Sequence, residues 1–371
     1  MPQHPQTMQA HFYTSTTGGL EKNLTFTRTA RTPPPPQSPS QVLIRVLSVS
    51  LNPADYKVPE QSTLFGRVLI CRTPASPGID FCGRVEAVHE SLDDEGEFHV
   101  GDLVLGCLAR PREFGSLAEF TIVSANDLVR LPAGVRVDEG ACVGVSVRTA
   151  WQALKYYGLS FSSSSEVSSG PEGIEGKERK KKRVFINGGS GGCGVFAIQF
   201  AKMLGCHVTV TCSSRNEELV RGLGADEVID YTSVDVLETL IAMVSKMEDG
   251  GGRFDHVIDH IGLPSNLYTE CHQFLKAGGA YVQVGAGSIS TVVWRTITPR
   301  WFGGGRRRYV ALMLENSKSD LEVVAGFLAE KKIRVVVDSV VGFSGEEVVA
   351  AYEKLRSGRA RGKIIVRVAE E

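Results

Sequence analysis

A glycine-rich loop at residues 188–194 constrains the fold of this chain more than any other feature of its sequence. The spacing G-x-G-x-x-G occurs at Gly189, Gly191 and Gly194, after a β-type run at 184–187 and before a helical pattern that starts at Val195. In this context the first glycine permits a tight turn, the second lets a pyrophosphate approach the backbone, and the third lets helix and strand pack closely. Unpaired N–H groups at the helix start then hold the phosphates. We therefore predict a dinucleotide site, with a glycine turn that holds no ligand as the alternative; the residues expected at the phosphates are Gly189, Ser190, Gly191, Gly192, Cys193 and Gly194.

The end of the next β-type run, at 207–212, indicates which dinucleotide binds. In a domain that binds NAD, an Asp or Glu about 20 residues beyond the loop hydrogen-bonds to the 2′-hydroxyl of the ribose. This chain instead has Ser213, Ser214 and Arg215. Hydroxyl groups and a guanidinium suit the additional 2′-phosphate of NADPH, and the stretch contains no carboxylate to repel it. We predict NADPH (NADP) as the cofactor. The alternative is that Ser213 caps the next helix and Arg215 is a solvated charge, although capping and phosphate binding are compatible.

Two kinds of pattern divide the chain into two domains. Short β-rich pieces separated by Pro and Gly fill residues 8–131 and are typical of a barrel-like domain. From Val184 onward, strand and helix patterns alternate, which predicts a parallel sheet with helices on both faces. We expect the first domain at 1–137, completed by about 335–371, and a nucleotide-binding domain at 138–334. A Ser-, Gly- and Lys-rich stretch at 161–183 predicts a disordered insertion, with a nuclear-import signal or a site for an acidic partner as the alternative.

The composition excludes several classes of protein. Lys plus Arg number 41 and Asp plus Glu 42, so the chain lacks the overall basic charge expected for a nucleic-acid partner. The sequence contains no run of about 20 apolar residues, so it predicts no transmembrane segment. Residues 1–10 lack the apolar core of a secretion signal. The eight cysteines include no C-x-x-C pair. We therefore expect reduced, mostly buried thiols and a cytoplasmic location.

Motifs along nearly the whole chain resemble the medium-chain dehydrogenase/reductase superfamily, and within it the zinc-free quinone oxidoreductase and enoyl reductase-like branch. Besides the glycine loop, the matching stretches are 50–57, 77–83, 100–106, 115–120, 223–231, 254–259 and 362–366. The resemblance implies an α/β protein with a GroES-like β-barrel catalytic domain, completed by the C-terminal strand, and a Rossmann domain with a doubly wound parallel sheet. It also implies a homodimer, and mitochondrial or lipid-surface association as an alternative location.

The resemblance also assigns residues to the site. It places Asn52 at the nicotinamide end of the cofactor, near Tyr56 and Lys57, and Thr149 against the nicotinamide or its ribose. The further cofactor-binding residues that it implies are Tyr231 by the adenosine phosphate, Val284 and Gly285 beneath the nicotinamide, and Lys363 at the cofactor or its phosphates. The alternatives are a turn held by Asn52 and Asp55, half-buried packing for Tyr56, and a surface charge for Lys363.

We predict no metal. Zinc-dependent relatives place a Cys ligand at the position of Asn52 and a His-Glu pair at Ile79 and Asp80. Catalytic zinc needs three N, S or O side chains, and Ile79 cannot be one of them. Residues 88–110 offer only Cys107 for a structural zinc site. His256 and His260 are four residues apart, but we expect them to be exposed at the end of a strand rather than on a metal.

Without a Lewis acid, reduction of a carbonyl to an alcohol is disfavoured, whereas hydride transfer to a carbon conjugated with a carbonyl needs mainly positioning. We predict an NADPH-dependent oxidoreductase that delivers hydride to a quinone or α,β-unsaturated carbonyl acceptor, an electrophilic small molecule. Tyr56, Lys57 or solvent supplies the proton. The alternatives are a trans-acting enoyl reductase of a biosynthetic pathway and a low-turnover NADPH-binding scaffold or sensor. At 296–309, Trp301 and Phe302 either cover an apolar substrate or belong to a packed crossover.

Overall fold

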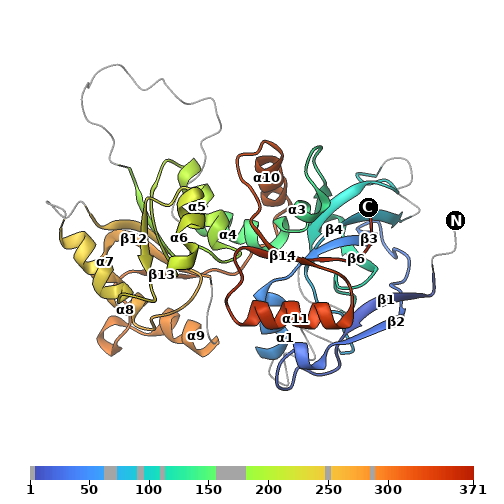
Figure 1. Ribbon diagram of the computed structural model, residues 1–371, viewed down its shortest axis with the longest axis horizontal. Coiled ribbons are helices and arrows are strands. Elements are labelled where there is room, and N and C mark those ends of the chain that lie inside the picture. Colours follow the sequence, from blue (N-terminus) through green and yellow to red (C-terminus); the bar gives the residue numbers. More distant parts are fainter. Residues whose placement is uncertain are drawn as a thin grey trace, which may run out of the picture. The chain divides into compact units, whose positions relative to one another are not determined.

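The computed structural model describes residues 5–61, 73–89, 96–108, 113–155, 181–246, 252–284 and 289–371. Two compact units form (Figure 1): unit 1 comprises Met1–Arg148 and Leu314–Glu371, and unit 2 comprises Thr149–Met313. The sequence patterns placed these divisions after residues 137 and 334. The structure places the first division later because the segments at Val137–Gly140 (α3) and Val143–Val147 (η4) contact strands of unit 1. It places the second division earlier because the helix at Lys318–Ala329 (α10) packs against strand and helix segments of unit 1.

Unit 2 contains a six-stranded sheet in which every pairing is parallel. Its strand order, β10-β9-β8-β11-β12-β13, is the 3-2-1-4-5-6 order of the Rossmann fold. The central strands are buried at every residue, so both faces of the sheet are covered. The strands are β8 (Arg183–Asn187), β9 (His207–Cys212), β10 (Glu227–Asp230), β11 (Phe254–Asp259), β12 (Leu275–Gln283) and β13 (Arg308–Ala311).

Helices lie on both faces of this sheet. In Figure 1, α5 (Gly194–Met203) and α6 (Glu217–Gly222) lie on one side of β12 and β13, with α8 (Leu267–Glu270) and α9 (Ile289–Ile297) on the other. α5 buries its first eight residues because small and apolar side chains occupy every turn. α7 (Val236–Ser245) is capped by Asp235, whose carboxylate accepts the N–H of Glu238. Shorter helical turns are η5 (Ser214–Asn216), η7 (Cys271–Gln273) and η8 (Arg300–Phe302), and α4 (Arg148–Lys155) begins where the two units divide.

Unit 1 is built on a seven-stranded sheet with the order β14-β15-β3-β4-β5-β7, and β6 pairs with β3. The last strand pairs antiparallel with β3, with Ile365 opposite Ser50, so distant parts of the chain form one barrel-like sheet. The strands are β3 (Gln41–Ser50), β4 (Asp80–Val88), β5 (Leu103–Cys107), β6 (Phe120–Ser124), β7 (Leu128–Arg130), β14 (Val337–Val341) and β15 (Lys363–Arg367), and β1 (Thr7–Phe12) with β2 (Thr25–Arg31) forms a separate hairpin. This barrel with the parallel sheet of unit 2 confirms the expected fold class.

Helices of unit 1 complete its core. Ser344 caps α11 (Gly345–Arg356) by accepting the N–H of Glu347, and Ser317 caps α10 in the same way. Tyr352 of α11 is fully buried among residues of β3, β4 and β15. The remaining helical elements are α1 (Pro53–Gln61), α3 (Val137–Gly140), η1 (Glu21–Asn23), η3 (Ala125–Asp127) and η4 (Val143–Val147).

Three sequence expectations fall wholly or partly outside the described residues: the insertion at 161–183 apart from its last three residues, Gly285, and Cys71. The seven cysteines that the structure describes are all free, and all but Cys193 are buried, as expected. In the described part of the chain, no helix is both long enough and apolar enough to cross a bilayer.

Candidate active site

The glycine loop of unit 2 has one open position between two crowded ones. A Cβ added at Gly189 would lie 2.9 Å from the side chain of Val210, and one at Gly194 would lie 2.1 Å from the carbonyl oxygen of Gly188. A Cβ at Gly191 would meet only that carbonyl, at 3.8 Å. The first and third glycines therefore serve the turn and the contact of helix with strand. The second leaves the backbone free for a phosphate group, so the loop fits a dinucleotide.

Side chains at the strand ends hold the loop in place. The Thr211 hydroxyl donates to Asn187 Oδ1 (2.7 Å) and accepts the Gly188 N–H (2.8 Å), and the Gly189 N–H donates to the Thr211 carbonyl (2.8 Å). Asn187 Nδ2 donates to Asp259 Oδ1 (2.8 Å). These bonds connect the ends of β8, β9 and β11 at the point where the strand order reverses, which is where ligands of such sheets bind. Sequence reasoning missed all three polar residues, although each stands at or next to the end of an apolar strand.

The start of α5 adjoins the loop. Cys193 at its N-cap makes no side-chain hydrogen bond to the first turn. Ser190 Oγ accepts a hydrogen bond from Asn216 Nδ2 (3.1 Å), and the same amide lies 3.4 Å from Ser213 Oγ. Asn216 therefore connects the loop to the turn after β9. The partly exposed Gly191 and Gly192 remain accessible to a ligand.

The turn after β9 presents the residues expected at a 2′-phosphate. Ser213 is buried, whereas Ser214 and Arg215 are exposed at the start of η5. The Arg215 guanidinium is therefore accessible to an anion from solvent. A hydroxyl, a second hydroxyl and a cation within one turn match the donor types that a phosphate monoester takes.

The structure adds a carboxylate that sequence spacing does not reveal. Asp230 ends β10, the neighbour of β9, and accepts the backbone N–H of Ser214. Its bonds to the hydroxyl (2.6 Å) and N–H (2.9 Å) of Thr232 lower its pKa, so it is ionised at neutral pH. Tyr231 follows it, half-exposed, and its N–H donates to the Cys212 carbonyl (3.3 Å). The turn at residues 213–215, which we expected to be free of carboxylates, therefore has the Asp230 carboxylate beside it. This carboxylate already accepts hydrogen bonds from Ser214 and Thr232.

Lys363 is the centre of a buried polar cluster in unit 1. Its side chain is 2% exposed, and Nζ donates to Asn52 Oδ1 (2.6 Å), Ser146 Oγ (2.9 Å) and the Leu51 carbonyl (3.1 Å). An ammonium group has three donors, and these acceptors engage all of them. The surface charge considered as an alternative is therefore wrong. The expected contact with cofactor phosphates would require one of these bonds to break.

Asn52 is equally engaged. Its Nδ2 donates to the Ser50 carbonyl (3.0 Å) and to Asp80 Oδ2 (2.8 Å), and its Oδ1 accepts from Lys363 and Ser146. Asp80 is fully buried, and burial raises its pKa while Lys363, 4.0 Å away, lowers it. The cluster is thus a compensated ion pair fixed by an amide, the arrangement that makes a buried charge tolerable. The sequence identified Asn52 and Lys363 but not their partners Asp80 and Ser146.

Asp55 extends this cluster. Its Oδ2 accepts the Asn52 N–H (2.8 Å) and lies 3.5 Å from the Tyr352 hydroxyl, while its buried Oδ1 has no hydrogen-bond partner. Burial raises the pKa of Asp55 to about 7. This carboxyl therefore exchanges its proton near neutral pH. The turn that the sequence analysis gave as an alternative role for Asn52 is present, formed by Asp55.

The other expected catalytic residues lie in different surroundings. Tyr56 is 7% exposed in the core of unit 1, with the Arg356 guanidinium 4.2 Å above its ring. Burial raises its pKa, so its hydroxyl stays protonated. Lys57 is half-buried on the same helix, and Thr149 is buried near the start of α4 in unit 2. Tyr56 thus has the packing role given as its alternative, and its hydroxyl remains a donor.

Val284 follows β12, and its N–H donates to the Asp259 carbonyl (2.8 Å). It therefore lies next to the end of β11, near the point where the strand order reverses. Trp301 and Phe302 are 82% and 70% exposed, respectively, so they do not belong to a packed crossover.

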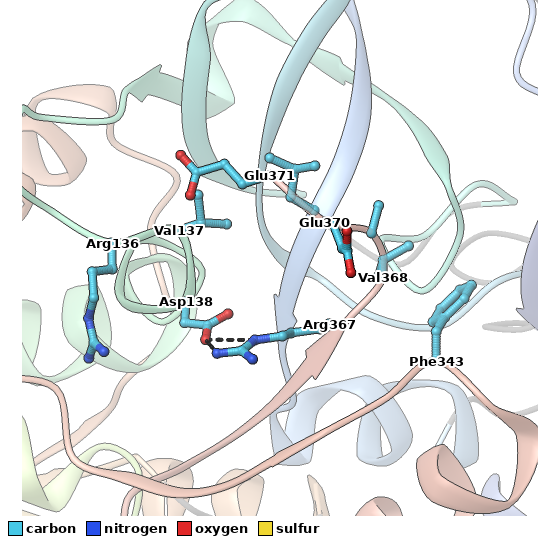
Figure 2. Close-up of a pocket in the computed structure, with 10 residues that line it drawn as sticks. Arg136, Val137, Asp138, Phe343, Arg367, Val368, Glu370 and Glu371 are labelled. Carbon is cyan, nitrogen blue, oxygen red and sulfur yellow. Dashed lines mark hydrogen bonds and ion pairs between the residues drawn. The ribbon is translucent and has the colours of Figure 1, made fainter.

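Figure 2 shows a different pocket, on unit 1, near the end of the chain. Two of its charged groups form a pair: Arg367 donates to Asp138 Oδ2 through Nη2 (2.6 Å) and Nε (3.1 Å). Phe343, Glu370 and Glu371 line other parts of it. None of the expected site residues lines this pocket, so we do not assign the chemistry to it.

The doubly wound sheet with its open glycine loop defines a dinucleotide-binding protein, and comparisons with known proteins identify the family. Residues 38–133 match the alcohol dehydrogenase GroES-like domain, and residues 223–366 match the zinc-binding dehydrogenase family. The trans-enoyl reductase pgmF of Aspergillus terreus is 40% identical over 99% of this chain and 98% of its own length. A chloroplastic quinone-oxidoreductase homolog of Spinacia oleracea is 30% identical over 90% of this chain and 91% of its own.

A solved structure agrees. The quinone oxidoreductase from Coxiella burnetii superposes with a TM-score of 0.77 at 26% identity and covers 97% of this chain and 99% of its own. The chain belongs to the medium-chain dehydrogenase/reductase superfamily, in its quinone oxidoreductase and enoyl reductase-like branch. It is an oxidoreductase, and its fold implies a nicotinamide cofactor, NAD or NADP.

Proposed function

We propose that this protein is an NADPH-dependent reductase that delivers hydride to a quinone or an α,β-unsaturated carbonyl acceptor without zinc. The observation that carries the proposal is the turn after β9, where Ser213, Ser214 and Arg215 stand next to the glycine loop and Asn216 connects the two. The names of relatives, trans-enoyl reductase and quinone-oxidoreductase homolog, support the acceptor class.

The residues of the chain act mainly by binding and orienting. The glycine loop and the start of α5 hold the diphosphate, and Ser214 with Arg215 holds the 2′-phosphate. NADPH supplies the hydride when bound. The acceptor then needs a proton, and the three sources in this proposal are solvent, the Lys57 side chain and the Tyr56 hydroxyl, which burial keeps protonated. Replacing Tyr56 by Phe and, separately, Lys57 by Met distinguishes them, because turnover stays unchanged in both variants if solvent is the donor.

The donor set in unit 1 supports a reaction without zinc. The described residues bring no three His, Cys, Asp or Glu side chains together in a group that fits a metal ion. At the Asn52 position the Lys363 ammonium supplies a positive charge, which balances Asp80. We expect turnover to persist after dialysis against a chelator, and elemental analysis of the purified protein to show far less than one zinc per chain. Stoichiometric zinc whose removal abolishes turnover would overturn this part.

The main experiment follows NADPH fluorescence with the purified protein and a panel of quinones and enones. We expect NADPH to bind and to be oxidised in the presence of at least one of these acceptors. Binding without oxidation, both across this panel and with enoyl groups attached to a carrier protein, would instead indicate the scaffold or sensor. Absence of binding by both NADPH and NADH would overturn the proposal as a whole.

A second candidate is a trans-acting enoyl reductase that serves a biosynthetic synthase. It is favoured by the 40% identity to a trans-enoyl reductase across 99% of this chain. The two candidates differ in the acceptor that they need. Rapid reduction of enoyl groups attached to a carrier protein, with little reduction of free enones or quinones, would favour the second. Comparable rates on free and carrier-bound acceptors would favour the first.

We also propose a cytoplasmic location and a homodimer. The seven free cysteines support a reducing compartment. β10 and β13 form the two edges of the sheet in unit 2, and an exposed edge can pair with a second copy. Fractionation of cells and light scattering of the purified protein test these two points.

A further inference from the structure

His260 occupies a position beside the glycine loop. It follows β11 directly, and its N–H donates to the carbonyl of Asn187, the last residue of β8 (3.1 Å). Its Cβ lies 3.6 Å from the point where a Cβ on Gly188 would stand. The residue is therefore located where β8 and β11 separate and the strand order reverses, the position at which a dinucleotide crosses such a sheet.

Both ring nitrogens of His260 are buried and have no hydrogen-bond partner. The expectation of an exposed strand end is wrong for His256, which is fully buried within β11, and its Nε2 lies 2.9 Å from the Ala153 carbonyl. An unpaired buried polar group costs about 1–3 kcal/mol, so natural proteins rarely leave one without a function or a ligand. Two such atoms on one ring, next to a nucleotide loop, indicate a group that binds there.

The chemistry of the ring selects the partner. Burial lowers the pKa of His260 to about 4, so the imidazole is neutral at the pH of the cell. A neutral imidazole has one N–H donor and one bare nitrogen that accepts. A sugar hydroxyl both donates and accepts, whereas an ionised phosphate only accepts. The ring therefore suits hydroxyl groups better than the diphosphate.

The topology selects the sugar. In the sheet, β9 and β11 lie on opposite sides of β8. The turn after β9 holds the residues expected at the adenosine 2′-phosphate, so a dinucleotide that crosses the end of β8 brings its other half over β11. The sugar on that side is the ribose attached to the nicotinamide.

We propose that His260 hydrogen-bonds to a hydroxyl of the nicotinamide-side ribose and so positions the ring that carries the hydride. This inference rests on the proposed use of a nicotinamide dinucleotide and assigns one residue to one half of it. His260 is a binding and positioning residue and transfers no proton in this scheme.

Calorimetry with two probes tests the assignment. NADPH contains the nicotinamide-side ribose, whereas adenosine 2′,5′-bisphosphate contains only the other half. In a His260→Leu variant, which fills the space without polar atoms, we expect NADPH to bind about tenfold more weakly and the bisphosphate to bind within twofold of wild type. Equal affinity of variant and wild type for NADPH would overturn the inference and indicate that ordered water pairs with the ring.

A second measurement uses the unmodified protein and does not depend on the variant folding. With ¹⁵N-labelled histidine, we expect the ring nitrogen signals of His260 to shift when NADPH is added and to stay in place when the bisphosphate is added. If the ring nitrogen signals of His260 do not shift when NADPH is added, the inference is wrong. If neither probe binds wild type, and NADH does not bind either, the proposed function itself fails, which is a distinguishable result.

Discussion

The glycine loop of unit 2 and the Lys363 cluster of unit 1 are two polar sites built in opposite ways. The loop consists mostly of backbone, and its open face at Gly191 leaves space for a ligand. The cluster consists of buried side chains from β15, α1, β4 and η4, and its ammonium and amide are fully engaged with each other. The first arrangement leaves space and donors for a ligand, whereas the groups of the second satisfy one another. The difference teaches that polarity and burial alone do not identify a binding site; unused bonding capacity does.

The largest expected effect tests whether the Lys363 cluster is structural. Lys363→Met leaves Asp80 buried without its cation, and breaking a buried pair costs about 3–5 kcal/mol of unfolding free energy. The exposed Lys22, replaced by Met, is the matched control and should change stability by less than about 0.5 kcal/mol. Urea denaturation measures both.

Adding Asp80→Asn to Lys363→Met removes the unpaired charge, so we expect the double variant to regain part of the lost stability. A Lys363→Met protein with wild-type stability but weak NADPH binding would reverse the comparison. It would show that the lysine belongs to the cofactor site.

The next effect compares two glycines of one loop. Gly194→Ala places a methyl group 2.1 Å from a carbonyl oxygen. We expect this variant to lose about 1–3 kcal/mol of unfolding free energy and also to lose NADPH binding. Gly191→Ala meets no atom closer than 3.8 Å, so thermal unfolding should stay near wild type. Its NADPH affinity should nevertheless fall about tenfold because the methyl group occupies the phosphate approach. Equal affinity of Gly191→Ala and wild type would show that the open face is not used.

A smaller effect sharpens the assignment of the turn after β9. Arg215→Ala removes one charged contact of about 1.5–3 kcal/mol, so NADPH should bind roughly tenfold to a hundredfold more weakly. NADH, which lacks the 2′-phosphate, should bind almost as before. Arg359→Ala, an exposed arginine of unit 1, is the control and should affect neither nucleotide. Equal losses for NADPH and NADH on Arg215→Ala would contradict the phosphate role.

The last effect, which appears only as a dependence of stability on pH, concerns the proton on Asp55. Its pKa is about 7 in the folded protein and 3.8 ordinarily, so between these values the folded state holds a proton that the unfolded state has released. The contribution of Asp55 to stability therefore falls as pH rises, by up to about 1.4 kcal/mol per pH unit, and levels off above the folded pKa. Asp55→Asn lacks this dependence. Urea denaturation from about pH 5 to pH 8 should show the unfolding free energy of the variant rising relative to that of wild type up to about pH 7. If the difference between the two proteins does not change with pH, the raised pKa is wrong.

Sequence reasoning succeeded where the determining residues are neighbours in the chain. The glycine loop, its preceding strand and its following helix lie within one short stretch, and the parallel pairing of the strands follows from their alternation with helices. It failed where the partners are distant. Lys363 and Asn52 are 311 positions apart, and nothing near Lys363 in sequence reveals that its ammonium is buried.

The same limit applies to Asp230, which reaches the turn after β9 from the next strand of the sheet. It applies also to Tyr56, whose ring packs beneath a guanidinium contributed by α11. His260 was recognised only as a strand-end histidine, because the absence of partners for its nitrogens is a property of three-dimensional packing. A local pattern predicts the element on which a residue lies, whereas the bonds that the residue makes depend on the complete fold.

The pairing of β15 with β3 has a consequence for biosynthesis. The partner of β3 and the cation for Asp80 both lie in a segment that is synthesised after all of unit 2. During translation, unit 2 can fold from its own contiguous stretch, whereas the barrel must wait with one strand edge bare and one carboxylate uncompensated. We therefore expect the nascent barrel to depend on chaperones more than unit 2 does.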